Sequence, residues 1–231
     1  MTPDPQQTFA KRSKKVVRRL VPNFLLRQRS IVRRLEPGSA RAYLRLRLLD
    51  MLGIRIANQR MAPPSARCFL FVCSGNMMRS AMAEFAMRQT LRDAGLEDQV
   101  RILSAGLHAS PGGEAHPWAQ QASAEVGISL AAHRAKLVTQ EIVEQADCIF
   151  AMDFQNKAEL LTLYPKAREK VLMLSAYADG PGQYREIEDP YFGDIETTRR
   201  CCQQLQTCVR NLAIRTFPLF ADSIRRVTPK E

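Results

Sequence analysis

The sequence lacks any long apolar run and the residue spacings that build metal sites or disulfide frameworks. No stretch of about 18 apolar residues occurs, and the N-terminus has no compact apolar segment followed by small residues, so we expect neither a membrane span nor a secretory signal. The six cysteines form no Cys-x-x-Cys pair, and there are three histidines, which argues against zinc and against disulfides. We therefore expect a cytoplasmic protein without metal or other cofactor.

The composition is that of an ordinary globular protein. Of 231 residues, 45% are hydrophobic and 25% are charged, so a chain of this length can bury a core without covalent crosslinks.

The excess positive charge is confined to the first quarter of the chain. Residues 1–60 contain 15 basic and 3 acidic residues, a net charge of +12, whereas residues 61–231 contain 19 basic and 20 acidic residues, a net charge of −1. We therefore divide the chain into a basic extension, residues 1–62, and a domain, residues 63–231. An electrostatic partner concerns the extension alone.

Part of the extension has the pattern of a basic helix over residues 40–49, with Ser39 as its N-cap. Leu44, Leu48 and Leu52 fall on one stripe. Such a helix fits an anionic membrane surface or an acidic partner, and it also fits packing on the following domain. A targeting peptide, and translation starting at Met61, are further interpretations that the sequence leaves open.

From residue 67 onward, strand patterns alternate with helix patterns. This alternation predicts an α/β fold of three layers, in which a four-stranded parallel sheet carries helices on both faces, preceded by the Arg-rich extension. We expect strands over residues 68–72, 100–104, 147–152 and 170–174, and helices over residues 79–94, 115–126, 155–163 and from about 195. Ligands of such sheets bind at the carboxyl ends of the strands.

The first strand ends at Cys73 and leads through a short loop to Arg79 at the start of a helix. Such a loop turns its amide groups inward, and the helix N-terminus adds positive charge, which together make a phosphate-sized anion site. Gly75 and Asn76 readily adopt the left-handed backbone that a tight loop requires. Because the same field favours a thiolate, Cys73 is a candidate nucleophile, and the Arg79 guanidinium matches two phosphate oxygens. The simpler interpretation is that Cys73 is a small buried hydrophobic residue and not a nucleophile.

A second segment supplies a proton donor. Asp189 lies after the last strand, next to Tyr191 and Phe192, which are suited to wall a deep slot. We take Asp189 as the general acid. Glu186 and Glu188 are the alternatives, and we expect them to be solvated loop carboxylates.

Residues 67–212 resemble the low-molecular-weight protein tyrosine phosphatases, in particular the bacterial branch associated with exopolysaccharide and tyrosine-kinase systems. Four ordered segments carry the resemblance: Phe71-Val72-Cys73-Ser74-Gly75-Asn76 with Arg79-Ser80 and Met82-Ala83-Glu84, then Ser104-Ala105-Gly106, His133-Arg134-Ala135-Lys136, and Asp189-Pro190-Tyr191.

The resemblance implies that Cys73 forms a phosphocysteine and that Asp189 protonates the leaving phenol and then activates water. It implies a phosphate-binding loop made of Ser74, Gly75, Asn76, Met77, Met78, Arg79 and Ser80, with Ser80 bonded to the thiolate. It also implies that Asn76, Ser104 and His133 support the loop. For the substrate pocket we expect Met77, His108, Tyr191 and Phe192.

The sequence departs from the family pattern at three positions. Met78 stands where a second cysteine is usual, Ala81 where a proline is usual, and Ser110 where an aromatic residue or leucine is frequent. Without the neighbouring thiol we expect no protective disulfide, so peroxide should oxidise Cys73 further.

Several functions compete. We expect a phosphotyrosine phosphatase acting on a phosphoprotein, with a bacterial tyrosine kinase as a candidate partner. Met77 argues against a phosphoarginine phosphatase, whose members tend to carry a small hydroxyl residue there. An arsenate reductase would need two further cysteines after the third strand, where none occurs. A non-catalytic phosphopeptide-binding or scaffold protein anchored by its basic extension is the non-enzyme alternative. Nucleic acid is disfavoured because the extension has almost no aromatic residues among its basic ones.

Overall fold

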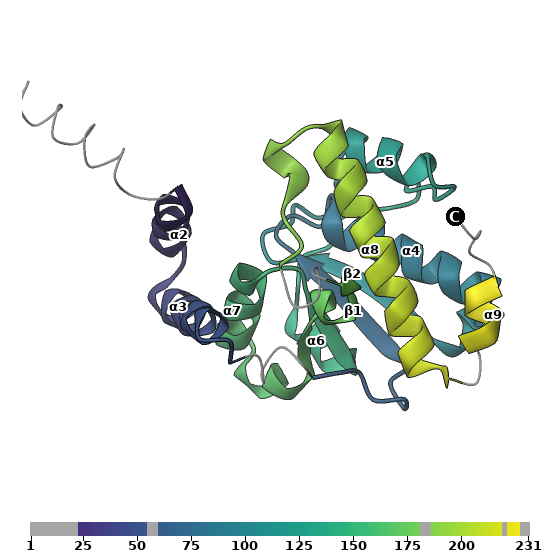
Figure 1. Cartoon of the computed structure of the whole chain (residues 1–231), viewed down its shortest axis with the longest axis horizontal. Helices are drawn as coiled ribbons and strands as arrows, with labels where there is room; N and C mark the ends of the chain where they lie inside the picture. Colours follow the sequence, from purple (N-terminus) through teal and green to yellow (C-terminus); the bar gives the residue numbers. More distant parts are fainter. Residues whose placement is uncertain (1–22, 55–59, 181–185, 219–220, 227–231) are drawn as a thin grey trace, which may run out of the picture.

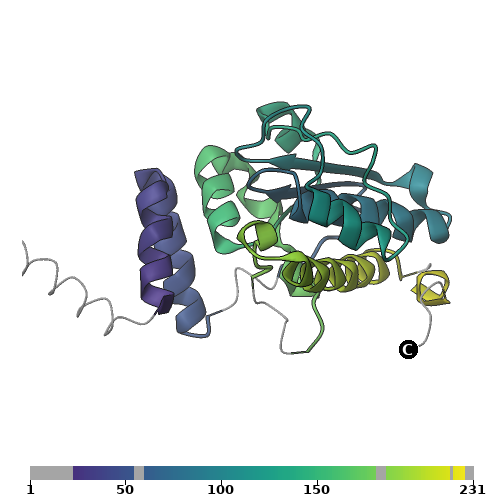
Figure 2. The same ribbon diagram turned by 90° about the horizontal axis from the view of Figure 1, so that it is seen from above.

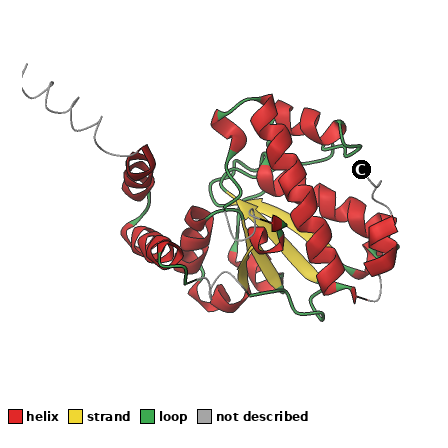
Figure 3. Cartoon of the chain, in the orientation of Figure 1, coloured by secondary structure: helices red, strands yellow, loops and turns green. Residues whose placement is uncertain are grey.

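A four-stranded parallel sheet lies between two layers of helices in the computed structural model, which describes residues 23–54, 60–180, 186–218 and 221–226 (Figures 1 and 3). The sheet order is β2-β1-β3-β4. The strands are β1 (Cys68–Cys73), β2 (Arg101–Gly106), β3 (Cys148–Ala151) and β4 (Val171–Met173). The α-helices are α2 (Asn23–Arg34), α3 (Pro37–Met51), α4 (Arg79–Asp93), α5 (Pro117–Ala124), α6 (Gln140–Gln145), α7 (Phe154–Leu163), α8 (Ile195–Thr216) and α9 (Ala221–Arg226). The 3-10 helices are η2 (Glu97–Gln99), η3 (Pro165–Lys170), η4 (Leu174–Tyr177) and η6 (Pro190–Phe192).

Alternation along β1 divides the core between the two faces of the sheet. Phe69, Phe71 and Cys73 belong to the apolar cluster that includes residues of α4 and α8. Leu70 and Val72 belong to the cluster on the opposite face, with residues of α3 and α7. Successive side chains of a strand point to opposite faces, and every residue of β1 is buried. The three-layer α/β architecture predicted from the sequence is therefore confirmed.

The order of the strands places the end of β1 where a ligand is expected. The chain leaves β1 toward β2 on one side and returns to β3 on the other, so the carboxyl end of β1 lies beside a topological switch point. Cys73 is the last residue of this strand and pairs in register with Gly106.

The predicted elements of the domain are present, with shifted ends. The helix predicted over residues 115–126 begins at Pro117 and ends at Ala124, because His116 caps it and Gly127 takes a left-handed φ of +79° after it. α6 and α9 have six residues each, and the sequence analysis missed them because so short a segment shows little periodicity. α2 was missed as well.

Ser39 does not cap α3, which corrects the sequence prediction. α3 begins at Pro37, whose fixed φ suits the first helical turn, and Glu36 precedes it without a side-chain cap bond. Ser39 instead lies buried within the helix. A Cβ on Gly38 would come within 2.8 Å of the Thr162 side chain of α7, so glycine lets the two helices approach closely.

The basic extension contains a helix that packs on the domain, as one of the four interpretations predicts. Tyr43 and Leu46 of α3 are buried and join the cluster that contains Phe154 and Leu160 of α7. Figures 1 and 2 show α3 alongside α7. The boundary at residue 62 stays a prediction, and the basic run Lys11 to Arg19 lies outside the described residues. Within the described part of the chain, no helix is long and apolar enough to cross a bilayer.

Candidate active site

The loop between β1 and α4 curls around the sulfur of Cys73. The Asn76 amide donates to Cys73 Sγ at 3.3 Å, and Ser80 Oγ lies 3.0 Å from the same sulfur. Cys73 is buried, with 3% of its surface exposed. The structure therefore brings together the candidate nucleophile, the loop and the serine that the sequence analysis assigned to the thiolate.

Asn76 fixes the shape of this loop. It takes a left-handed φ of +53°, and its side-chain amide nitrogen donates to Ser80 Oγ (2.9 Å) and Ser104 Oγ (2.8 Å). Its side-chain oxygen accepts from the Lys136 amide at 2.8 Å. Gly75 keeps an ordinary φ, contrary to the expectation for both residues. The turn falls on Asn76 because side-chain hydrogen bonds can offset backbone strain there.

His133 and Ser104 complete the support of the loop. The Nε2 of His133 lies 2.6 Å from the Asn76 carbonyl oxygen, a contact that requires a proton on that nitrogen. Ser104 Oγ donates to Glu84 Oε2 at 2.5 Å, and Arg88 holds Glu84 at 2.9 Å. The predicted trio of Asn76, Ser104 and His133 is thus assembled. The sequence analysis gave Glu84 no role, although an acid in an otherwise apolar helical turn beside the loop was a signal.

Gly106 allows β2 to press against the loop. A Cβ at this position would lie 2.6 Å from the Ser74 carbonyl oxygen and 2.8 Å from the Asn76 nitrogen, closer than side chains tolerate. Its neighbours Leu107 and His108 donate their amides to the carbonyl oxygens of Cys73 (3.0 Å) and Ser74 (2.8 Å). The end of β2 therefore fixes the far side of the loop.

Arg79 is buried and held among carboxylates. Its Nη1 donates to Asp153 Oδ2 (2.6 Å) and to the Ile187 carbonyl oxygen (3.0 Å), and its Nη2 donates to Asp189 Oδ2 (2.5 Å). Burial opposes the charge, but Asp153 and Asp189 outweigh it and raise the pKa of Arg79. Arg79 and Asp189, two of the predicted catalytic residues, are therefore in direct contact.

Asp153 is a functional residue that the sequence analysis missed. It caps α7 by accepting from the Asn156 amide at 2.7 Å, while its other oxygen holds Arg79. Because it follows the end of β3, a strand adjacent to β1, its place at the carboxyl edge of the sheet was predictable.

An aromatic cluster lies beside Asp189. The Tyr191 ring lies 5.0 Å from that of Phe192 and 5.7 Å from that of His116, and His116 lies 5.1 Å from Trp118. The His116 amide donates to the Met77 carbonyl oxygen at 2.9 Å, which ties the cluster to the phosphate loop.

His108 differs from the expectation that it helps to wall this pocket. Its side chain is 60% exposed and pairs with Glu159 of α7 through Nε2, at 2.6 Å. The aromatic contact with Tyr191 comes from His116 instead, which the sequence analysis did not single out. The buried Glu159 carboxylate holds the His108 ring toward α7, on the other side of the sheet.

Glu186 is not the solvated loop carboxylate that the sequence analysis expected. One of its oxygens accepts from the Phe154 amide at 2.7 Å, and the other forms an ion pair with Arg47 of α3. Burial raises the pKa of Glu186, whereas Arg47 and the Phe154 amide lower it. Glu188 is exposed, as expected.

The remaining cysteines lie in the core. Cys68 and Cys148 lie on strands, and Cys201, Cys202 and Cys208 lie on α8; all five are buried. Burial raises the pKa values of Cys148, Cys201 and Cys208 to about 12, so these thiols stay protonated and unreactive. Met78 and Ala81, the two departures in the loop, are buried as well.

The site opens into a cavity of about 1050 Å³. Its lining includes Ser74, Arg79, Asp153 and Asp189, together with Arg47 of α3. In the described ranges no three His, Cys, Asp or Glu side chains gather as a metal would require, and metal-free catalysis stays a prediction.

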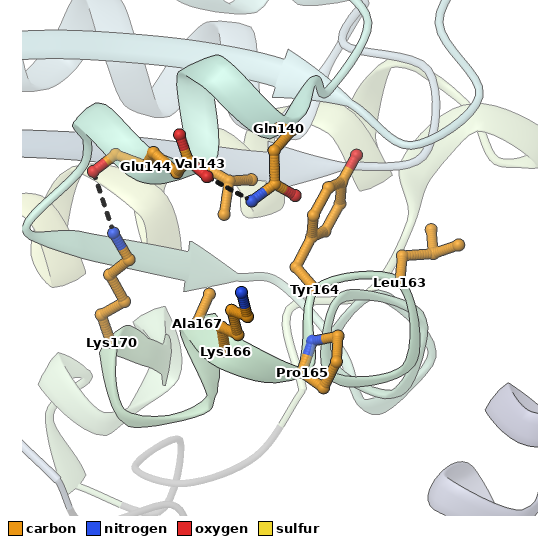
Figure 4. A pocket seen from close by; sticks show the side chains of 9 residues that line it. All are labelled: Gln140, Val143, Glu144, Leu163, Tyr164, Pro165, Lys166, Ala167 and Lys170. Carbon is orange, nitrogen blue, oxygen red and sulfur yellow. Dashed lines mark hydrogen bonds between the residues drawn. The ribbon is translucent and has the colours of Figure 1, made fainter.

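A second groove, between α6 and the end of α7, shares no residue with this site (Figure 4). It is lined by Gln140, Val143 and Tyr164 among others, and Lys170 Nζ donates to the Glu144 carbonyl oxygen at 3.1 Å across it. It contains none of the residues predicted for catalysis.

Loop support by His133 makes stability depend on pH. Burial lowers the pKa of His133 from its ordinary value of about 6.5. As the pH falls through about 6.5, the unfolded chain binds a proton that the folded chain does not, so the free energy of unfolding decreases. In His133→Gln, which keeps a donor for the Asn76 carbonyl, we expect a smaller decrease between pH 7.5 and 5.5, measured by urea unfolding. Gln203→Ala, at an exposed, uncharged residue of α8, is the control. An unchanged pH dependence in His133→Gln would contradict this role.

Comparisons with known proteins identify the fold and the loop. The sequence model of one family, the low molecular weight phosphotyrosine protein phosphatases, matches residues 69–225. The protein-arginine-phosphatase of Bacillus subtilis (strain 168) is 36% identical over 144 residues, covering 62% of this chain and 93% of that protein. The probable low molecular weight protein-tyrosine-phosphatase EpsP of Ralstonia nicotianae is 32% identical over 140 residues, covering 61% of this chain and 89% of that protein.

A solved structure agrees with the sequence match. The protein tyrosine phosphatase of Entamoeba histolytica superposes with a TM-score of 0.61 at 27% identity, covering 65% of this chain and 96% of that chain. Because the family model spans more than half of the sequence and includes the loop around Cys73, this chain belongs to the low-molecular-weight phosphotyrosine protein phosphatase family.

Proposed function

We propose that the protein hydrolyses phosphotyrosine monoesters in proteins through a cysteinyl-phosphate intermediate. The observation that carries the proposal is the meeting of Cys73, Arg79 and Asp189 beside an aromatic cluster. Cys73 Sγ accepts from the Asn76 amide, Arg79 donates to Asp189 at 2.5 Å, and Asp189 lies two residues before Tyr191 of that cluster.

The first step transfers the phosphoryl group to Cys73. Its thiolate attacks phosphorus, the sulfur–phosphorus bond forms, and the bond from phosphorus to the phenolic oxygen breaks. Asp189 donates its proton to the departing oxygen. The loop amides and Arg79 stabilise the charge on the remaining phosphate oxygens.

The second step releases phosphate. Asp189, now a carboxylate, takes a proton from water as that water attacks phosphorus, and the sulfur–phosphorus bond breaks. Ser80 Oγ, 3.0 Å from the sulfur, donates to the thiolate that leaves.

Arg79 changes partners during this cycle. Its Nη2 faces Asp189 in the structure, and a bound phosphate competes for the same donor. Displacement by phosphate frees the Asp189 carboxyl, which is 39% exposed, to turn toward the leaving group.

Met77, His116 and Tyr191 favour an aryl phosphate. Met77 is a bulky residue in the loop, and the rings of His116 and Tyr191 lie 5.7 Å apart beside it. Phe192, whose ring lies 5.0 Å from that of Tyr191, lines the cavity of the site, and a flat phenyl ring gains from contact with such rings. The second candidate is phosphoarginine, because the Bacillus subtilis relative is named for that activity and carboxylates beside Arg79 suit a guanidinium.

A substrate panel separates these candidates. We expect the protein to release phosphate from phosphotyrosyl peptides, but not from phosphoseryl or phosphoarginyl peptides, in the presence of a chelator. Cys73→Ser should abolish turnover, and Cys68→Ser, at the other end of β1, should retain it. Release from phosphoarginyl peptides alone would favour the second candidate. Binding without turnover would favour the phosphopeptide-binding module.

Loss of the general acid should depend on the leaving group. Phenolate leaves poorly without a proton, whereas p-nitrophenolate leaves readily. In Asp189→Asn we therefore expect kcat/KM, which reports the first step, to fall roughly 100-fold for phenyl phosphate and far less for p-nitrophenyl phosphate. Glu188→Gln is the control. Equal losses on both substrates would contradict the role of Asp189.

For the basic extension we propose contact with an anionic membrane surface, by a protein otherwise in the cytoplasm. Leu44 and Leu48 of α3 and Leu52 directly after it are at least half exposed, and Arg41 and Arg45 lie exposed on the same face. An apolar stripe flanked by arginines suits the boundary between headgroups and acyl chains. The phosphotyrosine protein, with a bacterial tyrosine kinase as candidate, would then be met at the membrane.

Vesicle binding tests this contact. We expect the full chain to co-sediment with vesicles containing phosphatidylserine and to be released by salt, but not to bind phosphatidylcholine vesicles. Replacing Leu44, Leu48 and Leu52 by serine should weaken binding at least about tenfold. Leu163→Ser, at an exposed leucine of α7, is the control. Absence of vesicle binding would leave an acidic protein as the partner.

A further inference from the structure

Arg47 of α3 lies at a junction between the N-terminal extension and the loop that carries Asp189. Its guanidinium carbon lies 5.3 Å from the centre of the Tyr43 ring and 4.9 Å from that of the Phe154 ring. Its Nε donates to Tyr43 Oη at 3.0 Å, and its Nη2 pairs with Glu186. The Arg47 side chain is 18% exposed, so this ion pair is largely shielded from water.

Glu186 connects this junction to the helix that presents Asp153. Its second oxygen accepts from the amide of Phe154, the first residue of α7. Asp153 is the adjacent residue and holds Arg79 at 2.6 Å. One carboxylate therefore joins α3 to the N-terminus of α7.

Glu186 also begins the described segment that leads to Asp189. Between them, the Ile187 amide donates to the Met152 carbonyl oxygen at 2.9 Å, and the Ile187 carbonyl oxygen accepts from Arg79 at 3.0 Å. The Ile187 side chain is fully buried. Residues 186–189 are thus held by Arg47 at one end and by Arg79 at the other.

Arg47 lies outside the part of the chain that the family model matches. That match begins at residue 69, whereas the loop that Arg47 holds lies within it. The same helix lines the cavity of the site through Tyr43, Arg47 and Asp50.

The geometry points to Arg47 as a positioning residue, through which the N-terminal extension holds the Asp189 loop in place for proton transfer. This inference rests on the proposed function, since it assumes that Asp189 protonates the leaving group. Arg47 acts through Glu186 and does not itself touch the reacting atoms. Removing it leaves the shielded Glu186 carboxylate without its cation, so the segment that ends at Asp189 loses its anchor.

The test compares leaving groups in the full chain. In Arg47→Met, which keeps much of the apolar stem, we expect kcat/KM to fall about tenfold for phenyl phosphate and less than threefold for p-nitrophenyl phosphate. Arg33→Met, at an exposed arginine of α2, should change neither. Glu186→Gln, which keeps an acceptor for the Phe154 amide, should show the same dependence on the leaving group.

A double variant separates positioning from general stabilisation. If Arg47 acts through Asp189, adding Arg47→Met to Asp189→Asn should lower kcat/KM for phenyl phosphate by less than twofold further, because the proton donor is already absent. Equal losses on both substrates, or full additivity of the two substitutions, would overturn the inference and leave Arg47 as a packing residue.

A measurement without turnover keeps the inference testable if the proposed function fails. Hydrogen exchange of the Ile187 amide reports how firmly the loop is held against Met152. We expect exchange to quicken about tenfold in Arg47→Met and to stay unchanged in Arg33→Met. If wild-type protein hydrolyses no aryl phosphate, the proposed function fails. If the wild-type protein hydrolyses aryl phosphates but Arg47→Met matches it in leaving-group dependence and in exchange of the Ile187 amide, only the role of Arg47 fails.

Discussion

The buried guanidinium of Arg79 is the group on which the arrangement of this site depends. A charge enclosed to this degree is stable only when carboxylates and carbonyl oxygens surround it. Here the partners are Asp153 at the start of α7 and residues 187–189 before η6. Arg79 on α4 and these two segments are distant in the sequence, so three parts of the chain must meet at one point, at the carboxyl edge of the sheet beside Cys73.

The loop between β1 and α4 is likewise shaped by the hydrogen bonds that its polar groups require. The backbone takes a left-handed φ at Asn76, and that residue is held by hydrogen bonds with the side chains of Ser80, Ser104 and His133 and with the Lys136 amide. The loop is therefore preorganised by neutral hydrogen bonds, while Arg79 is positioned by ion pairs. The two systems lie next to each other in the chain, because Ser80, which contacts the sulfur and the Asn76 side-chain amide, directly follows Arg79.

A structural feature could be predicted when the residues that indicate it lie close together in the sequence. Cys73, Arg79 and the alternation of strands and helices are encoded within short segments, so the sequence predicted the sheet and the loop. The place of Asp153 at the carboxyl edge of the sheet follows from its position after β3, but its ion pair with Arg79 depends on a contact across the fold, and so does the ring contact of His116. Glu186 was misjudged for the same reason, because its partner Arg47 lies 139 positions away. His108 was misassigned because Glu159 of α7, 51 positions away, determines where its ring points.

Two features of α3 act together: its inner and outer faces make different contacts, and a short segment joins it to β1. Tyr43 and Arg47 face the domain, while Leu44 and Leu48 face outward, so a ligand on the outer face does not compete with the inner contacts. Only the short segment of residues 52–67 separates α3 from the first strand, and a short tether keeps a segment at an effective concentration on the order of millimolar. Once released, α3 therefore returns to its place far faster than a separate molecule could take it.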